Sequence, residues 1–494
     1  MAVAHAALGR IPMSGCHVTD VCSRSVSVPD TSANTTSSSP ETSADLVVLG
    51  AGSGGYACAL RAAQLGLTVV LVEKDKLGGT CLHRGCIPTK ALLQAAEVAD
   101  AARDGHQFGV KSALEGIDMA GVNKYKDGVV AKMFKGLQGL VLSRGINYVE
   151  GTGRFVAPNA VDVDGQRYTG RNVVLATGSY ARSLPGLEIG GRIVTSDQAL
   201  NLDYLPERVV VLGGGVIGVE FASVWRSFGA DVTVVEALPR LLPAEDDFCS
   251  KQLERAFRRR GIMFKTAARL TGASQSEAGV TVSLESGEQL EADLLLVAVG
   301  RGPNTAEAGY SEAGVRMERG FVLTGDRLQT NLPGVYALGD IVPGFQLAHR
   351  GFAQGIFLAE EIAGRKPSTI DEDGIPRVTY CEPQVAAVGL TEAQARQRHG
   401  EIETITYDLA GNGKSVILQT RGAIKLVRAK HGPVLGVHMV GDRVGELVGE
   451  AQLIVNWDAY PDDVAALVHA HPTQNEALGE AHLALAGKPL HAHG

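Results

Sequence analysis

From Asp45 onward, the chain alternates short apolar runs with longer segments of helical periodicity. The apolar run at residues 46–49 is followed by a glycine-rich turn, a helical segment at residues 56–65 and a second apolar run at residues 68–72. This order is typical of a βαβ unit that opens a parallel sheet. We therefore predict an α/β fold.

The turn between the first predicted strand and helix contains three spaced glycines, Gly50, Gly52 and Gly55, in the run GAGSGG. Such glycines allow a tight turn and let the backbone approach a pyrophosphate at the helix N-terminus. Glu73 ends the second strand about 20 residues further on, where a carboxylate accepts a hydrogen bond from a ribose hydroxyl. A glycine triad alone also fits a simple turn, but the strand, helix and acid around it predict a dinucleotide site.

The same pattern recurs in the run RVVVLGGGVIGVE. An apolar run at residues 208–212 precedes the turn, and another at residues 231–235 leads into Glu236. The glycines of this second turn are Gly213, Gly215 and Gly218. The chain therefore predicts two dinucleotide sites.

Glu236 also indicates which nicotinamide dinucleotide binds. Its carboxylate can pair with a free ribose 2′-hydroxyl but repels a 2′-phosphate. The arginine cluster that would bind such a phosphate is missing, since only Arg240 follows nearby. NAD is therefore favoured over NADP.

Two cysteines, Cys81 and Cys86, follow the first turn in the run GGTCLHRGCIPTK. In an ideal helix, residues five apart have Cα atoms about 8.7 Å apart, which is too far for a disulfide. We therefore expect Cys81 outside regular helix, with glycines at residues 78–85 allowing a bend and Pro88 in the first turn of the next helix. Two buried free thiols are the ordinary alternative, but a thiol pair beside a bound dinucleotide indicates electron transfer.

The composition narrows the range of functions. The chain has 494 residues, 45% of them hydrophobic, which suffices for three or more domain cores. Its net charge is -8, from 46 basic and 54 acidic residues without a Lys/Arg block, so nucleic acid and anionic lipid are not expected partners. The most apolar long window, residues 209–225, is interrupted by glycines and Glu220, so no membrane span is predicted.

The seven cysteines are an odd number in a large chain, unlike a secreted disulfide framework. We therefore expect a reducing, cytoplasmic location. The first 43 residues are rich in Ser and Thr and poor in aromatic residues, which predicts a disordered tail. Cys16 and Cys22 lie in this tail without a second pair of ligands, and we predict no metal site.

The run HPTQNE near the end of the chain has two interpretations. Thr473 and Glu476 match a capping box that opens the last helix. Alternatively, Glu476 holds His471 as a general acid and base for thiol chemistry. The local sequence leaves both open, whereas His469, His491 and His493 are interpreted as structural or solvated.

Together these motifs resemble the pyridine nucleotide-disulfide oxidoreductases, and within them most closely the dihydrolipoamide dehydrogenases of the actinobacterial kind. The resemblance extends from Asp45 to the C-terminus. It rests on the runs already quoted and on VVLATGS (residues 173–179), VAVGRGPNT (297–305), YALGD (336–340), QLAH (346–349) and HAHPTQNEALGE (469–480).

The resemblance implies FAD in the first site and NAD in the second, with the disulfide stacked against the flavin. Lys90 and Glu220 would form an ion pair beside the flavin N5. Besides the two glycine triads and this pair, the positions implied to bind cofactor are Glu73, Thr80, Gly153, Thr177, Gly178, Ser179, Asp340, Gln346, Leu347, Ala348, His349, Glu236 and Gly300.

The resemblance also implies the reaction. A dihydrolipoyl dithiol, deprotonated by His471 of the other subunit, would attack Cys81, leaving the Cys86 thiolate against the flavin, which then reduces NAD. The carrier would be a lipoylated acyltransferase of a 2-oxoacid dehydrogenase complex or a glycine-cleavage carrier protein, and the enzyme a homodimer. The alternatives are an NADPH-dependent glutathione- or mycothione-type disulfide reductase and a redox-inactive structural flavoprotein subunit.

The implied organisation is two Rossmann-like domains and a C-terminal α+β dimerisation domain. The predicted portions are a tail (1–43), an FAD-binding domain in two parts (44–194 and 317–367), an NAD-binding domain (195–316) and the dimerisation domain (368–494). The chain departs from the commonest family pattern at His83, Arg84 and Thr89. Arg84 would either tune the thiols or recognise an acidic carrier.

Overall fold

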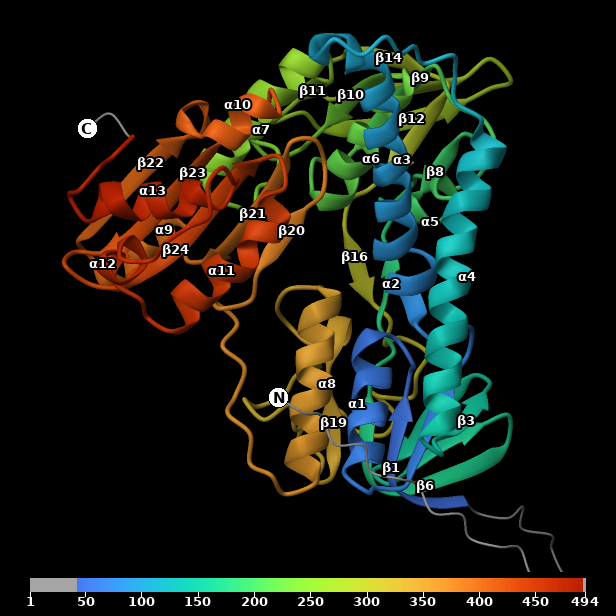
Figure 1. Cartoon of the computed structure of the whole chain (residues 1–494). Helices are drawn as coiled ribbons and strands as arrows, with labels where there is room; N and C mark the ends of the chain where they lie inside the picture. Colours follow the sequence, from blue (N-terminus) through green and yellow to red (C-terminus); the bar gives the residue numbers. More distant parts are fainter. Residues whose placement is uncertain (1–41, 492–494) are drawn as a thin grey trace, which may run out of the picture. The chain divides into compact units, whose positions relative to one another are not determined.

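The structure, a computed structural model, describes residues 42–491 (Figure 1). Cys16, Cys22, His493 and almost all of the predicted tail lie outside these residues. Strand β1 (Thr42–Leu49) includes the last two residues of the predicted tail, because its pairing with β6 extends to Thr42 and Ser43.

The first sheet surrounds β1. Its strand order is β3-β2-β1-β6-β5-β4, and β19, which comes much later in the chain, also pairs with β6. Strands β1, β2, β3, β6 and β19 run parallel, whereas β5 pairs antiparallel with both β6 and β4. The bounds are β2 (Val69–Glu73), β3 (Asn147–Glu150), β4 (Gly153–Ala157), β5 (Ala160–Val163), β6 (Gln166–Leu175) and β19 (Val335–Ala337).

Strand β1 is buried on both faces, which explains its uninterrupted apolar sequence. Leu46 and Val48 pack in a core with residues of two helices, α1 (Ser53–Gln64) and α8 (Ala348–Ile362). Val47 and Leu49 face a second core on the opposite side of the sheet. The turn that follows β1 is therefore fixed by a fully packed strand.

Helices α1 and α8 lie side by side on the first sheet (Figure 1). Their backbones approach so closely that a Cβ added at Gly355 would lie 2.4 Å from the carbonyl oxygen of Gly54. Glycine is therefore required on this contact, and it brings the first turns of both helices to the carboxyl edge of the sheet.

The second sheet repeats the arrangement. Its order is β11-β10-β9-β15-β8, all parallel, and α6 follows β9 as α1 follows β1. A small antiparallel sheet, β12-β13-β14, adjoins it in sequence. The bounds are β8 (Ile193–Thr195), α5 (Ser196–Ala199), β9 (Arg208–Leu212), α6 (Val216–Phe228), β10 (Asp231–Val235), α7 (Asp247–Arg260), β11 (Met263–Lys265), β12 (Leu270–Gln275), β13 (Val280–Leu284), β14 (Gln289–Ala292) and β15 (Leu294–Val297).

The third sheet, β20-β21-β24-β23-β22, is antiparallel, and α11 and α13 pack on it. Its elements are β20 (Arg377–Thr379), β21 (Gln384–Gly389), α9 (Glu392–His399), β22 (Ile402–Asp408), η3 (Leu409–Gly411), α10 (Gly413–Ile417), β23 (Ala423–Ala429), β24 (Val434–Gly441), α11 (Val444–Asn456), α12 (Pro461–Ala465) and α13 (Glu476–Leu485).

Buried ion pairs join this third sheet to the second unit. Arg377 of β20 contacts Glu245 at 3.1 Å, and Lys425 of β23 contacts Asp246 at 2.8 Å. Both acids lie just before α7. Charges that are buried in this way stay favourable only while they are paired, so the two units are fastened together.

The connecting elements complete the chain. They are α2 (Gly79–His83), α3 (Cys86–Asp104), η1 (Gly105–Phe108), α4 (Met119–Ser143), β7 (Ser179–Ala181), β16 (Arg301–Pro303), β17 (Met317–Glu318), β18 (Phe321–Val322) and η2 (Gly339–Ile341). Within residues 42–491, no helix has the length and apolar character needed to cross a bilayer. The predicted α/β fold with two dinucleotide-type sheets and a C-terminal α+β unit is confirmed, while the exact domain boundaries stay a prediction.

Candidate functional site

The first glycine turn has a geometry that leaves one position open. A Cβ at Gly50, where φ is +105°, would lie 2.3 Å from the carbonyl oxygen of Ala176, and one at Gly55 would lie 1.8 Å from that of Gly50. Gly52, in contrast, has nothing within 4 Å of its added Cβ. The protein itself therefore does not require a glycine at residue 52, whereas a bound group approaching the backbone does.

The second turn has the same geometry. A Cβ at Gly213 would lie 2.3 Å from the carbonyl oxygen of Ala298, and one at Gly218 would lie 1.9 Å from that of Gly213. Gly215 again faces open space. Two turns with the same two internal constraints and the same open position fit two dinucleotides.

The two acids close these turns through both of their oxygens. Glu73 accepts from the backbone of Ala51 at 2.7 Å and of Asp75 at 3.0 Å. Glu236 accepts from Gly214 at 2.6 Å and from Leu238 at 2.7 Å. Each carboxylate is therefore fixed at the end of its strand with lone pairs remaining for a ribose hydroxyl.

The two cysteines lie in different helices. Cys81 is in α2, which ends at His83, and Cys86 is the first residue of α3. The expectation that Cys81 lies outside regular helix is therefore wrong. The geometric reason behind it remains valid, because Arg84 and Gly85 leave the helical conformation and separate two helices that could not be one.

The turn between α2 and α3 brings the thiols together. Both are free and half-buried, and they are in hydrogen-bond contact. The hydrogen bond from Cys81 lowers the pKa of Cys86 to about 7; burial opposes this shift and the Lys90 ammonium adds to it. The same hydrogen bond and burial raise the pKa of Cys81. The negative charge of the pair therefore rests on Cys86.

Lys90 follows Cys86 by one helical turn and is held from two other elements. Its Nζ lies 2.9 and 2.8 Å from the two carboxylate oxygens of Glu220, which is buried in α6. It also lies 4.7 Å from the ring centroid of Tyr380, whose backbone N–H donates to Glu220 at 2.8 Å. Burial lowers the pKa of Lys90, but Glu220 raises it and the net shift is upward. The predicted Lys90–Glu220 contact is therefore present.

The start of α2 rests directly on the first glycine turn. Gly79 has a φ of +58°, and a Cβ there would lie 2.7 Å from the Cα of Gly52. Ser53, the first residue of α1, forms a hydrogen bond with the Cys81 thiol. Thr80, another predicted cofactor position, is the second residue of α2, between Gly79 and Cys81. The thiols are thus positioned by the same turn that leaves room for a ligand.

Three further predicted positions form one polar group near the end of β6. Ser179 donates to Asp340 at 2.5 Å, and Gln346 donates to the backbone oxygen of Asp340 at 3.3 Å. Arg301 donates to both the hydroxyl and the backbone oxygen of Ser179 at 2.8 Å. Gly178 and Gly300 have positive φ and open space at the Cβ position.

Other predicted cofactor positions already have protein partners. The Thr177 hydroxyl contacts the Asn304 carbonyl at 2.7 Å and the Tyr310 hydroxyl at 2.9 Å. A Cβ at Gly153 would meet Leu49 at 2.5 Å, which by itself explains the glycine.

The remaining three predicted positions lie at the start of α8. Leu347 is its N-cap residue and Ala348 is its first residue. His349 hydrogen bonds the Pro376 carbonyl through Nε2 at 2.7 Å.

Tyr380 and Arg301 are site residues that the sequence analysis missed. Arg301 could have been found, because it lies next to Gly300 in a run already singled out. Tyr380 carries no local signal, since its contacts to Lys90 and Glu220 arise only when β20 is docked.

Glu476 combines the two roles that the sequence left as alternatives. Its Oε1 lies 2.8 Å from His471 Nδ1, while its Oε2 accepts from the Thr473 backbone at 2.7 Å. The Thr473 hydroxyl in turn accepts from the Glu476 backbone at 3.3 Å. Burial raises the pKa of Glu476, but the Thr473 and His471 hydrogen bonds lower it below its usual value. The carboxylate is therefore charged, oriented and able to stabilise an imidazolium.

The His471 side chain is 77% exposed. Within residues 42–491, it forms a hydrogen bond to Glu476 and none to Cys81 or Cys86. One protomer therefore does not bring the imidazole and the thiols together. Of the other histidines, His469 is half-buried and contacts Glu450, whereas His491 is exposed and contacts Glu480 at 2.9 Å.

The three departures from the family pattern have local explanations. His83 contacts the Leu77 carbonyl through Nε2 at 2.9 Å, and Thr89 donates to the Gly85 carbonyl at 2.7 Å. Arg84 pairs with Asp75 at 2.8 Å. Its charge is thus already partnered.

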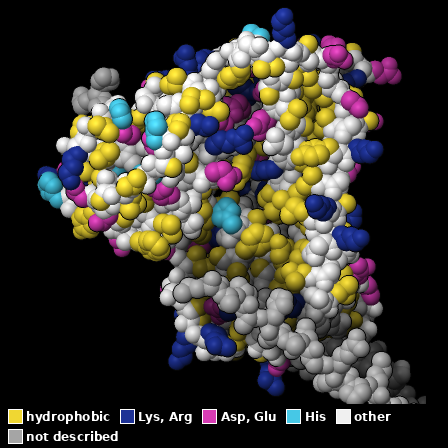
Figure 2. Space-filling model, viewed as in Figure 1, with side chains coloured by type: hydrophobic (Ala, Val, Ile, Leu, Met, Phe, Trp, Pro, Cys, Tyr) yellow, Lys and Arg dark blue, Asp and Glu magenta, His cyan; other side chains and the backbone are white. Residues whose placement is uncertain are grey.

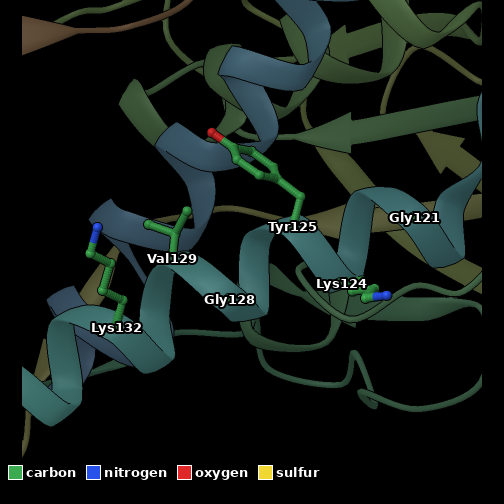
Figure 3. A pocket seen from close by; sticks show the side chains of 6 residues that line it. All are labelled: Gly121, Lys124, Tyr125, Gly128, Val129 and Lys132. Carbon is green, nitrogen blue, oxygen red and sulfur yellow. The ribbon is translucent and has the colours of Figure 1, made fainter.

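A surface groove lies on α4 rather than at these residues. It is lined by Gly121, Lys124, Tyr125, Gly128, Val129 and Lys132 (Figure 3). Figure 2 shows hydrophobic side chains along the part of this face where α3 and α4 lie. No predicted site residue lines the groove. Among the residues that the structure describes, no cluster of His, Cys, Asp and Glu could hold a metal ion.

Comparison with known proteins decides the family. Residues 44–355 match the pyridine nucleotide-disulphide oxidoreductase family, and residues 375–482 match the dimerisation domain of the same family. The chain belongs to this family. The C-terminal α+β domain is therefore its dimerisation domain, which supports a homodimer.

Named relatives cover most of the chain. It is 38% identical to a dihydrolipoyl dehydrogenase of Bacillus subtilis over 90% of its length and 99% of that protein's. It is 39% identical to the mitochondrial dihydrolipoyl dehydrogenase of Pisum sativum over 90% of this chain and 92% of that protein. The structure of LpdA from Mycobacterium tuberculosis superposes with a TM-score of 0.84 at 26% identity, covering 90% of this chain and 99% of that one.

Proposed function

We propose that this protein is a dihydrolipoyl dehydrogenase that oxidises protein-bound dihydrolipoamide and reduces NAD+ to NADH. The observation that carries this proposal is the thiol pair on the first dinucleotide turn, with the charge placed on Cys86. The similarity to proteins named dihydrolipoyl dehydrogenase over nine-tenths of the chain supports the choice of substrate.

The residues fit the two cofactors that the family uses. The turn with the open Gly52, together with Glu73 and the Ser179–Asp340 group, would hold FAD. The turn with the open Gly215, together with Glu236, would hold NAD. When bound, FAD supplies the two-electron transfer between the thiol pair and NAD+.

The thiol pKa values determine which sulfur the substrate attacks. In the oxidised enzyme, Cys81 and Cys86 form a disulfide. A substrate thiolate that attacks Cys81 expels Cys86, and a thiol of lower pKa is the better leaving group. The second substrate thiol then attacks the mixed disulfide, which releases cyclic lipoamide and the Cys81 thiol. The substrate loses two electrons and the enzyme disulfide gains them.

Protons are handled by a neighbouring group. His471 of the partner subunit takes the proton of the attacking thiol, because its second nitrogen is held by Glu476 and the first is left free. Lys90 lies close enough to stabilise the Cys86 thiolate that results. An exposed imidazole on a dimerisation domain is what a site shared between two subunits requires.

The carrier is proposed to be a lipoylated acyltransferase of a 2-oxoacid dehydrogenase complex or a glycine-cleavage carrier protein. We place the enzyme in the cytoplasm, since the cysteines outside the redox pair within residues 42–491, Cys58, Cys249 and Cys381, are buried and free and unpaired thiols fit a reducing compartment.

The test is NADH formation by the purified holoenzyme supplied with dihydrolipoamide and NAD+. Rapid NADH formation, with NADP+ much poorer, is the expected result. A parallel assay follows NADPH oxidation with glutathione disulfide or mycothione. Failure of the first reaction with success of the second would identify a disulfide reductase instead. Failure of both with FAD bound would identify a redox-inactive subunit.

A further inference from the structure

A second imidazole–carboxylate pair lies behind the His471–Glu476 pair. His469 Nε2 is 2.9 Å from Glu450 Oε1, and Glu450 is on α11 rather than on the loop itself. The other oxygen of Glu450 accepts a hydrogen bond from the Asn475 side chain. One carboxylate therefore ties together both ends of the loop that carries His471.

The pair is much less exposed than His471. The His469 side chain is 11% exposed and that of Glu450 is 25% exposed, against 77% for His471. The imidazole packs on α13 at Gly479, where an added Cβ would lie 2.6 Å from His469 Nδ1. A glycine one turn into α13 thus makes the space that the ring occupies.

The half-buried pair of His469 and Glu450 also acts electrostatically on the pair of His471 and Glu476. His469 is among the groups that lower the pKa of Glu476. His482 is fully buried in α13, and burial lowers its pKa to about 4. Glu450 raises this pKa and His469 lowers it. His482 is therefore neutral near pH 7. The Glu450 carboxylate hydrogen bonds to the side chains of His469 and Asn475.

The middle of the loop has its own supports. Asn412 donates to the Thr473 carbonyl at 3.0 Å, and Ser415 donates to Gln474 at 2.7 Å. The first contact holds the backbone after His471, and the second holds the Gln474 side chain. The segment before His471 depends on His469. Among the hydrogen bonds of residues 42–491, Ala470 takes part only in one from the Thr473 hydroxyl, which lies within the loop itself.

We propose that His469 is a positioning residue: with Glu450 it fixes the angle at which His471 is presented to the thiols of the other subunit. This inference rests on the proposed function. Its physical basis is that a displacement of about 1 Å in a catalytic group lowers the rate by up to 100-fold. His469 itself touches neither substrate nor cofactor.

The test compares two replacements of His469 in the holoenzyme. His469→Ala removes the bond to Glu450, and we expect kcat for dihydrolipoamide oxidation to fall on the order of tenfold with KM for NAD+ unchanged. His469→Gln keeps an amide N–H that reaches Glu450, and we expect it to restore most of the rate. NADH-dependent ferricyanide reduction, which does not use the thiols, should stay normal in both.

A combination with His471→Gln separates positioning from general loss of structure. If His469 acts through His471, His469→Ala causes no further loss once His471 is replaced. An equal fractional loss in both backgrounds, a loss of ferricyanide reduction, or no loss in His469→Ala would each overturn the inference. Normal turnover in His471→Gln alone would instead overturn the role of His471 in the proposed function.

Discussion

Replacement of Lys90 tests whether its charge holds the Cys86 thiolate. The two residues are one helical turn apart in α3, where neighbouring side chains are about 6 Å apart. At an effective dielectric constant of about 20, a unit charge at that distance contributes about 3 kcal/mol, or about 2 pKa units.

Two features of the site modify this magnitude. The Lys90 side chain is 32% exposed, so solvent screening reduces the effect on the Cys86 pKa to between about 1 and 2 pKa units. Removal of Lys90 also leaves Glu220 unpaired beside Cys86, and that carboxylate raises the pKa of the thiol. Both consequences have the same sign, so Lys90→Met should raise the pKa of Cys86 from about 7 towards 8 or 9.

The pH dependence follows from this sign. A thiol reacts as its thiolate, so a higher pKa removes reactivity at low pH and leaves it intact at high pH. Near pH 7, about half of Cys86 is thiolate in the parent protein and about 1–10% in the variant. Alkylation of Cys86 should therefore slow by roughly 5- to 50-fold near pH 7 and be almost unchanged near pH 10.

The assay is the rate of iodoacetamide labelling of the Cys86 peptide in the reduced holoenzyme, followed by mass spectrometry from about pH 6 to pH 10. Burial raises the pKa of Cys58, Cys249 and Cys381, so their labelling is slow. Lys111→Met, at an exposed lysine, is the control for net charge. A shift below about half a unit in Lys90→Met, or an equal shift in Lys111→Met, would refute the reasoning.

Three further predictions concern the second turn and the domain contact. The Cβ added by Gly215→Ala has no protein atom within 4 Å, so this variant should raise KM for NAD+ about tenfold or more with an unchanged melting temperature. The Cβ added by Gly218→Ala would lie 1.9 Å from a carbonyl oxygen, so this variant should lower the melting temperature. The opposite pattern would contradict the assignment of the open position to ligand. Glu236→Gln removes the charge that repels a 2′-phosphate, so the ratio of kcat/KM for NAD+ over NADP+ should fall about tenfold or more; an unchanged ratio would exclude Glu236 as the selector. Glu245→Gln breaks a buried ion pair and should lower the free energy of unfolding, measured by urea titration, by about 3–5 kcal/mol. The control Glu312→Gln, at an exposed ion pair, should lower it by at most about 1 kcal/mol. Equal losses in the two variants would count against the domain contact.

Local patterns were enough to predict the turns and the acids that close them. The Gly50 and Gly213 turns depend on neighbouring strands and on glycine conformations that the sequence specifies within a few residues. The helix after the first turn was placed at residues 56–65, whereas α1 begins at Ser53, because the glycines that make the turn also form the first turn of the helix.

Contacts between distant segments were not predictable in the same way. Arg301 and Ser179 are 122 residues apart in sequence, and Tyr380 and Glu220 are 160 apart. Their pairing depends on how the second and third sheets are docked, which no periodicity records. The short helix α2 was missed for a different reason: the distance argument excluded one continuous helix but not two helices with a break at Arg84.

The contact between Gly79 and Gly52 has a consequence for how the protein matures. Since α2 begins against the Cα of Gly52, the seat of Cys81 does not exist until the first glycine turn has closed. A nascent or cofactor-stripped chain with that turn open carries two ordinary thiols without a fixed mutual distance. The low pKa of Cys86 is thus a property of the completed nucleotide site and not of the two cysteines alone.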